Sequence, residues 1–289
     1  MKPFEYLRPD TLEAACAALA EAGASARLLL GGTDLTVGLR HGHIQTDLVI
    51  DLKRVAALRP EIDIGTDILR ISAGTSMSAL ARFLEAEGLF PALSDAANVV
   101  GSIQIRNRAT LAGNICNASP AADTVPVLAA LGSSVEIIGP EGCRTALVAD
   151  FIEGNRKIDL AQGEIVTAVL IPMKTARHGC AFDRITRRRG VDLATANLCC
   201  MVGPDGEVVL AFGSVAPRPL VVRSCDAVLT DPAAGPEERA DVIRALCDHA
   251  TPISDVRASA GYRSAMLHVM TERALAVAKD RLANGGYHA

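Results

Sequence analysis

The sequence pattern breaks between residues 173 and 180, and this break constrains the fold more than any other feature of the chain. An apolar, strand-like run ends at Pro172, because proline cannot donate a hydrogen bond to a sheet. A new series of strand-like runs starts at Ala181. Since 289 residues are enough for two domains of ordinary size, we expect one domain over residues 1–175 and a second over residues 178–289.

Hydrophobic periodicity and turn residues predict the secondary structure within each part. Helical spacing predicts helices at 11–22, 77–89, about 92–100, 123–131, 237–249 and 262–284. Short apolar or alternating runs predict strands at 28–30, 47–52, 68–75, 133–138 and 163–172, with a hairpin turn at Pro204-Asp205-Gly206.

The composition excludes several classes of protein. A hydrophobic fraction of 49% with 21% charged residues is typical of a globular chain with a substantial core. The net charge of −4 gives no electrostatic basis for nucleic-acid binding. No apolar run is long enough to predict a transmembrane helix. The N-terminal MKPFEYLRPD lacks the apolar core of a signal peptide, so we expect a cytoplasmic protein.

The eight cysteines show neither a metal-binding nor a disulfide pattern. None forms C-x-x-C, and a disulfide framework is not expected without a secretory signal. Cys199 and Cys200 would point to opposite faces of a strand, which does not suit a shared metal ion. The six histidines also lack the spacing of metal ligands. We therefore expect buried or incidental thiols, no metal site, and no iron–sulfur cluster, which normally needs four clustered thiolates.

Two stretches, LLLGGTDL at 28–35 and ATLAGNICNAS at 109–119, place glycine and polar side chains directly after short apolar runs. Glycine lets the backbone approach a ligand closely or adopt a positive φ. Successive N–H groups in such a bend, with a helix N-terminus behind them, favour an anion. Thr33 or Asp34 can cap the helix after the first stretch, and Thr110 and Asn114 can add hydrogen bonds in the second.

An ordinary strand-to-helix turn explains either stretch taken alone. Two such stretches in one chain, both without lysine, favour a ligand whose phosphates are bound by backbone amides. The second lies within NRATLAGNICNASPAAD at 107–123, a long, polar stretch with almost no periodicity. The usual nucleotide-binding and hydrolase motifs are absent. We interpret the arginines at 184, 187, 188 and 189 as a solvated loop, with a docking surface for an anionic partner or cofactor as the alternative.

Four segments together resemble the FAD-binding medium subunit of the xanthine dehydrogenase and carbon monoxide dehydrogenase family, the molybdenum hydroxylases. They are LLLGGTDL at 28–35, GSIQIRNRATLAGNICNASPAADTVPVLAAL at 101–131, GEIVTAVLIP at 163–172 and DVRASAGYR at 255–263. The resemblance covers nearly the whole chain, in order. It implies an α+β fold: a two-subdomain FAD-binding domain of the vanillyl-alcohol-oxidase type, followed by a small α+β C-terminal domain with an antiparallel sheet.

The resemblance also implies an FAD site with two loops. The first, which would hold the pyrophosphate, comprises Leu30, Gly31, Gly32, Thr33, Asp34 and Leu35. The second comprises Thr110, Leu111, Ala112, Gly113 and Asn114. Asp123 would be the acid that contacts the flavin, and Val100 would lie beside its ring. Ile165 or Val166 would lie next to the flavin. No acid–base catalytic residue is expected on this chain.

The chain departs from the family pattern in three places. Ala112 stands where the second loop usually has its first glycine, which is compatible with close approach only if its φ is negative. Thr195 stands where animal xanthine enzymes carry a lysine near the flavin, so the local electrostatics and the electron acceptor are expected to differ. The cysteine-rich insert of the benzoyl-CoA reductase branch is missing.

The resemblance implies that this chain is the electron outlet of a larger enzyme. A large subunit with molybdopterin and a small subunit with two 2Fe–2S clusters would be its partners, in a dimer of heterotrimers. Electrons from the clusters would reach FAD and leave to NAD⁺, oxygen, a quinone or another acceptor. Two alternatives remain: a non-catalytic assembly subunit with a degenerate flavin site, and a stand-alone flavin oxidase. The substrate and the acceptor are not specified by the sequence.

Overall fold

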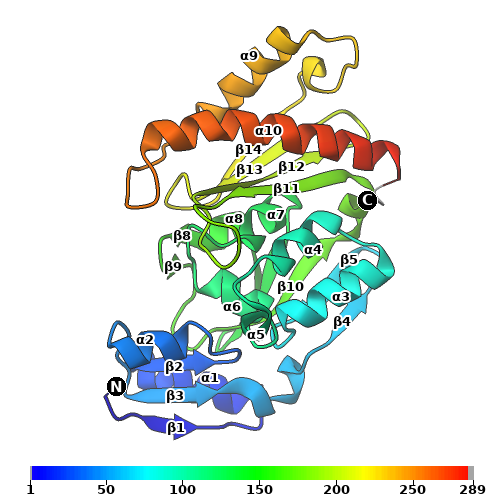
Figure 1. Cartoon of the computed structure of the whole chain (residues 1–289). Coiled ribbons are helices and arrows are strands. Elements are labelled where there is room, and N and C mark those ends of the chain that lie inside the picture. The colour runs from blue at the N-terminus through cyan, green and yellow to red at the C-terminus, as the bar shows by residue number, and fades with distance from the viewer. Residues whose placement is uncertain (1, 286–289) are drawn as a thin grey trace.

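The computed structural model describes residues 2–285, which form three tiers stacked along the molecule (Figure 1). The N-terminal tier, which we call the first subdomain, is a parallel sheet with strand order β1-β3-β2 and two helices. Its elements are β1 (Glu5–Leu7), α1 (Leu12–Ala22), β2 (Ala26–Leu29), α2 (Leu35–His41) and β3 (Leu48–Asp51).

The middle tier, the second subdomain, is built on a five-stranded antiparallel sheet with order β4-β5-β10-β6-β7. Its strands are β4 (Ile62–Ile64), β5 (Ile68–Ser72), β6 (Ser134–Gly139), β7 (Gly142–Leu147) and β10 (Ile165–Pro172). Its helices are α3 (Met77–Glu87), α4 (Pro91–Asn98), α5 (Ile103–Arg106), α6 (Leu111–Cys116), α7 (Thr124–Ala130) and α8 (Val148–Phe151). A two-stranded ribbon, β8 (Ile152–Gly154) and β9 (Lys157–Ile158), completes it.

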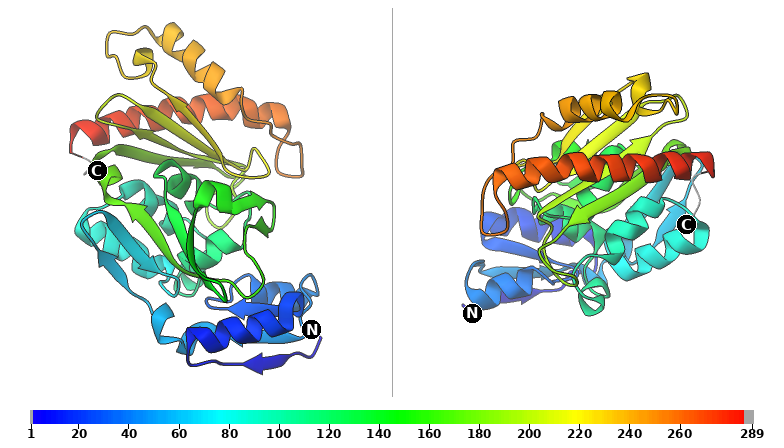
Figure 2. Two further views of the ribbon diagram at one scale, coloured as in Figure 1. Left: turned by 180° about the vertical axis from the view of Figure 1, so that it is seen from behind. Right: turned by 45° about the horizontal axis from the view of Figure 1, so that its top comes forward.

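The last tier, the C-terminal domain, is a four-stranded antiparallel sheet with two helices. The strands follow the chain order β11 (Gly179–Ile185), β12 (Ala196–Val202), β13 (Val208–Gly213) and β14 (Leu220–Ser224). Helix α9 (Pro236–Cys247) and the long α10 (Ala260–Ala283) follow. Figure 2 shows α10 crossing the outer face of this sheet, while the opposite face is turned toward the second subdomain.

Strand β12 of the C-terminal sheet contributes side chains to two cores, one on each face of the sheet. Cys199 belongs to the core shared with the second subdomain, whereas Cys200 belongs to the core under α10. The prediction that these two thiols point to opposite faces is therefore confirmed. Because side chains alternate along a strand, one face of β12 packs on α7 and the other on α10. The two apolar faces explain why this strand is buried throughout.

The elements agree with most of the sequence predictions, and the differences have local causes. The strand predicted at 28–30 is β2, which runs over Ala26–Leu29 and ends before Leu30, ahead of Gly31 and Gly32. Strand β1 (Glu5–Leu7) was not predicted. The turn after Pro204 is present between β12 and β13, with Gly206 at φ +84°. The predicted break coincides with a 3-10 turn over Met173–Arg177. The predicted α+β class is confirmed, whereas Met1 and residues 286–289 of the predicted domains lie outside the described chain.

One prediction was wrong in part. The stretch 107–123 is not irregular throughout, because six of its residues form helix α6. Thr110 caps this helix: its Oγ1 accepts a hydrogen bond from the N–H of Gly113 at 3.0 Å. The helix was missed because a glycine and an asparagine, both weak helix formers, lie in its single turn and a half. The Thr110 cap could have predicted it.

Candidate functional site

The first glycine loop, residues 31–34, connects β2 to α2. Gly32 has φ +74°, a conformation that favours glycine. Its carbonyl accepts hydrogen bonds from the N–H and the Oγ1 of Thr36, which close the loop onto α2. Within the described residues, the N–H groups of Gly31 through Asp34 donate no hydrogen bond to the chain. Four free amides at the start of a short helix can receive an anion.

Neither Thr33 nor Asp34 caps α2 through its side chain, contrary to the prediction. Asp34 occupies the N-cap position but has helical backbone angles, φ −91° and ψ −45°, and makes no side-chain capping bond. A residue in that conformation does not aim its carboxylate at the following amides. The absence of a protein cap leaves the helix N-terminus available to a ligand.

The two loops touch each other backbone to backbone. A Cβ added to Gly31 would lie 2.3 Å from the carbonyl oxygen of Arg108 and 3.1 Å from the Cα of Ala109. No side chain fits at that distance. Glycine at position 31 therefore permits the contact between the first subdomain and the second loop.

Hydrogen bonds to neighbouring elements fix the second loop. The N–H of Met77 donates to the carbonyl of Ala109, and the N–H of Leu111 donates to the carbonyl of Thr75 at 3.4 Å. Farther along, the Oγ1 of Thr124 donates to the Oδ1 of Asn114 at 2.8 Å. This bond fixes the side chain of Asn114 and ties α6 to the start of α7.

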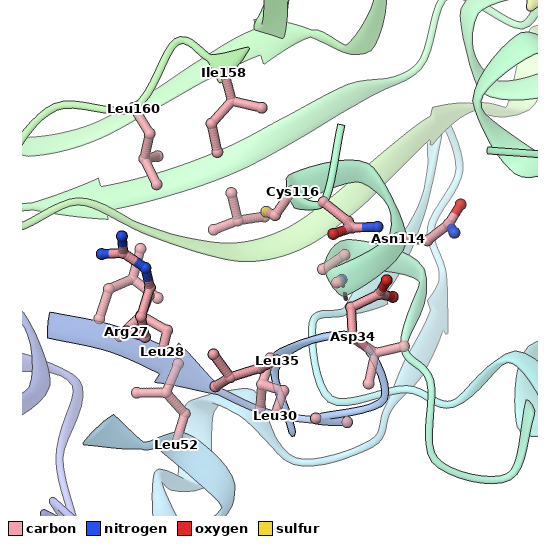
Figure 3. A pocket seen from close by; sticks show the side chains of 18 of the residues that line it. Arg27, Leu28, Leu30, Asp34, Leu35, Leu52, Asn114, Cys116, Ile158 and Leu160 are labelled. Carbon is pink, nitrogen blue, oxygen red and sulfur yellow. Dashed lines mark hydrogen bonds between the residues drawn. The ribbon is translucent and has the colours of Figure 1, made fainter. Parts of the chain in front are cut away.

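A cavity of about 740 Å³ lies between the first and second subdomains. Such a volume is within the range of cofactor pockets. Figure 3 shows Leu28, Leu30, Leu35 and Leu52 of the first subdomain on one side, with Cys116, Ile158 and Leu160 of the second subdomain opposite. The site thus combines apolar walls with a loop of free amides.

All but three of the predicted site residues line this cavity. The predicted residues that line it are Leu30, Gly31, Gly32, Thr33, Asp34, Leu35, Val100, Thr110, Ala112, Gly113, Asn114, Ile165 and Val166. Ala112 is buried in α6 and is not among the described residues with a positive φ, so alanine is compatible with this position. Leu111 is completely buried in the core behind the loop. Leu111, Asp123 and Thr195 do not line the cavity.

Asp123 lies in the seam between the second subdomain and the C-terminal domain. Its Oδ2 accepts a hydrogen bond from Arg184 at 2.9 Å, and its Oδ1 accepts one from the amide of Asn197 at 3.2 Å. Burial raises the pKa of Asp123 to about 6, although the charge of Arg184 and both hydrogen bonds act in the opposite direction. At neutral pH the group is mostly an ionised carboxylate, paired with a cation whose side chain is 15% exposed.

Arg184 corrects the interpretation of the arginine run. It lies in β11, with only 15% of its side chain exposed, and pairs with Asp123. Arg187, Arg188 and Arg189 are exposed, as the solvated-loop interpretation predicts.

Thr195 is buried, and its Oγ1 has no hydrogen-bond partner in the described chain.

Sequence reasoning missed the apolar wall of the cavity. Leu19, Leu28, Leu52 and the pair Ile158 and Leu160 come from four separate segments, and no single motif connects them. Cys116 lies within the second predicted stretch, where the sequence indicates no role for its thiol, yet it lines the cavity, and burial raises its pKa to about 12. The thiol is therefore protonated and apolar at neutral pH. Only the tertiary fold brings this set together.

The donor set fits a dinucleotide cofactor better than a metal. Free amides at the Gly31–Asp34 loop suit a pyrophosphate, and the apolar walls suit aromatic rings. Within residues 2–285, no group of three or more His, Cys, Asp or Glu side chains is arranged to hold a metal ion. Over the same residues, no helix is both long and apolar enough to cross a membrane.

Comparison with known families gives matches to two models. The model for the FAD-binding domain in molybdopterin dehydrogenase matches residues 2–174. The model for the carbon monoxide dehydrogenase flavoprotein C-terminal domain matches residues 181–278. Together they span most of the chain in the same order as the structural tiers.

Individual proteins are similar over nearly their full length. The chain is 32% identical to the carbon monoxide dehydrogenase medium chain of Afipia carboxidovorans, covering 97% of this chain and 98% of the relative. It is 29% identical to the xanthine dehydrogenase FAD-binding subunit of Escherichia coli O157:H7, covering 94% and 95%.

Solved structures agree. Reconstituted carbon monoxide dehydrogenase from Oligotropha carboxidovorans has a chain that is 30% identical, with a TM-score of 0.87 and coverage of 97% of this chain and 99% of that chain. Quinoline 2-oxidoreductase from Pseudomonas putida 86 has one that is 25% identical, with a TM-score of 0.86 and coverage of 98% and 99%.

Proposed function

This chain belongs to the FAD-binding subunits of the molybdenum hydroxylases, and from that premise we propose that it is the electron outlet of a larger oxidoreductase. Electrons arrive from 2Fe–2S clusters of a partner subunit and leave to NAD⁺, oxygen, a quinone or another acceptor. When bound, FAD supplies the redox chemistry, because it can take up electrons singly or in pairs. The residues of this chain bind and orient it.

The observation that carries the proposal is the contact between the two glycine loops beside the cavity. Gly31 rests on the carbonyl of Arg108, and the free amides of Gly31–Asp34 line the cavity next to α6. In the proposal these amides bind the pyrophosphate. The apolar side chains of Leu28, Leu52 and Ile158 exclude water from the rest of the cofactor.

The proposed site extends beyond the cavity to the three predicted residues outside it. Asp123 and Thr195 would lie beside the flavin ring, where the C-terminal domain meets the second subdomain. Leu111 would support the second loop from behind, since it is fully buried beneath it. Proton transfer by a side chain is not required for electron transfer, so no catalytic residue is proposed here.

Partner subunits complete the proposed enzyme. A molybdopterin-binding large subunit would oxidise the substrate, and a small subunit would carry two 2Fe–2S clusters, in a dimer of heterotrimers. Support comes from relatives that are themselves named as a medium chain or an FAD-binding subunit. The retained Gly31, Gly32, Gly113 and Asn114 favour a working flavin site over the alternative of a degenerate one. A cytoplasmic location stays a prediction from the sequence.

The test is to isolate the complex from its source through a tag on this chain. Flavin, iron and molybdenum should be found in the complex, whereas the chain produced alone should bind flavin without iron or molybdenum. Native mass measurement then gives the stoichiometry. A chain that purifies alone with full substrate-dependent activity would contradict the proposal and favour a stand-alone oxidase.

A further inference from the structure

The segment Pro120–Asp123 connects two parts of the cavity wall. On its N-terminal side, Asn117 lines the cavity. On its C-terminal side, Thr124 donates the hydrogen bond that fixes Asn114, another lining residue. A displacement of this segment would therefore move the wall on both sides. Within its own subdomain, the segment's N–H groups bond only locally, from Ala121 and Ala122 to Ser119, over the residues that the structure describes.

The C-terminal domain holds this segment at its acidic end. Arg184 of β11 donates to the carboxylate of Asp123. Asn197 of β12 donates to the carbonyl of Ala122 at 3.3 Å and to the same carboxylate. Asn197 is completely buried and Asp123 is 6% exposed. Hydrogen bonds to a buried ionised group are among the stronger ones in proteins.

A second attachment holds the other end of the segment. The N–H of Ser214 donates to the carbonyl of Pro120 at 2.7 Å, and Ser214 has φ +62°, which is unfavourable for serine. Arg263 of α10 donates to the carbonyl of Ser214 at 2.7 Å and pairs with Asp255 at 2.7 Å. Arg263 is 3% exposed. Both charged residues come from the segment DVRASAGYR, for which the flavin site gives no other role.

We propose that the C-terminal domain positions the wall of the FAD site through two arginines, Arg184 acting on Asp123 and Arg263 acting through Ser214 on Pro120. Both are positioning residues, because neither lines the cavity. The inference rests on the proposed function, in that the wall is taken to face FAD. It gives the C-terminal domain an indirect part in cofactor binding, through the position of the wall.

A double-mutant cycle on FAD affinity tests the attachment through Arg184 in the full chain. Arg184→Gln and Asp123→Asn should each weaken FAD binding by about tenfold, the loss expected for one charged hydrogen bond. The double variant should lose about the same factor as either single variant, because Arg184 acts through Asp123. Arg184→Lys should restore most of the affinity. If the two fold-losses in FAD affinity multiply in the double variant, Arg184 does not act through Asp123, and this part of the proposal is wrong.

Arg223→Gln is the matched control. Arg223 lies in the same sheet, on β14, and pairs with Glu207 within the C-terminal domain. The Arg223→Gln substitution removes the same charge as Arg184→Gln and should leave FAD affinity within about twofold of wild type. An equal loss in Arg223→Gln and Arg184→Gln would mean that net charge, and not positioning, determines the effect.

Hydrogen exchange tests both attachments, first on the wild-type chain. Binding of FAD should slow exchange of the amides of residues 121–124 and of Ser214. Arg263→Lys should speed exchange at Ser214 in the FAD-bound chain. If wild type binds FAD but these amides exchange at the same rate with and without it, the inference fails while the proposed function stands. If wild type does not bind FAD at all, the proposed function fails first.

Discussion

Gly31 lies so close to Arg108 that a Cβ on the glycine would be 2.3 Å from the arginine carbonyl oxygen. The two residues belong to different subdomains and to the two loops that border the cavity. Since the contact is between backbones, no rotamer change can relieve an added atom. The position of one loop relative to the other therefore depends on the absence of a side chain at position 31.

Gly31→Ala should separate the loops and weaken FAD binding by at least about tenfold. The free energy of unfolding should fall by roughly 1–3 kcal/mol, as for other overpacked sites. Fluorescence titration with FAD and denaturant melts of the FAD-free chain measure the two effects. Gly261→Ala is the control, because a Cβ there meets nothing within 4 Å. Unchanged affinity in Gly31→Ala would show that FAD does not depend on this contact.

Gly32→Val should abolish measurable FAD binding. The residue has φ +74°, where valine would be strained, and a Cβ there would lie 2.7 Å from the Cδ1 of Leu29, so the loop or the Leu29 side chain would have to shift. Gly42→Val provides a matched comparison, since Gly42 has φ +73°, a Cβ there meets nothing within 4 Å, and it does not line the cavity. Both variants should lose about 1–2 kcal/mol of stability for the left-handed conformation. Gly32→Val should lose more because of its close contact with Leu29, and only Gly32→Val should lose FAD. Equal FAD affinities in the two variants would place the pyrophosphate elsewhere.

Asp123 should make the stability of the FAD-free chain depend on pH. Burial raises its pKa to about 6 from an ordinary 3.8. Between these values the folded chain holds a proton that the unfolded chain has lost, so the free energy of unfolding falls as pH rises. Asp123→Asn should remove this slope. The stability of wild type relative to the variant should fall by on the order of 2–3 kcal/mol between about pH 4 and pH 7.

Denaturant melts at several pH values check this prediction, and parallel curves for wild type and Asp123→Asn would contradict it.

Asp123→Ala is a harsher change. It should cost roughly 3–5 kcal/mol, because it leaves Arg184 buried without its partner. A loss of about 1 kcal/mol would be expected if the residue only capped α7, but its side chain makes no capping bond.

Thr124→Val should loosen Asn114. The substitution keeps the shape of the side chain but removes the donor to the Asn114 Oδ1 at 2.8 Å. We expect FAD affinity to fall by about threefold to tenfold, in line with about 1 kcal/mol for a neutral hydrogen bond. Thr124→Ser keeps the hydroxyl and should bind FAD nearly as wild type does. If Thr124→Val binds as tightly as Thr124→Ser, Asn114 does not contribute through this bond.

The two glycine loops could be predicted from the sequence because their determinants are local. Gly32 and Thr110 act within a few residues of their position, through backbone freedom and capping. Gly31 shares the local glycine pattern, but its contact with Arg108 appears only in the folded chain. The apolar wall could not be predicted, since Leu19, Leu52 and Ile158 meet only when the subdomains pack. The pairing of Asp123 with Arg184, 61 positions later in the chain, could not be predicted either. An arginine that reaches back to another domain has the same local pattern as a solvated one.

Titration of the purified full chain with FAD tests the central claim most directly. The account predicts quenching of flavin fluorescence that saturates at one FAD per chain, and release of all the flavin into the supernatant on acid precipitation. The same titration of Gly32→Val should show no saturation. A wild-type chain with no saturable binding, or one whose flavin stays attached after acid precipitation, would contradict the account.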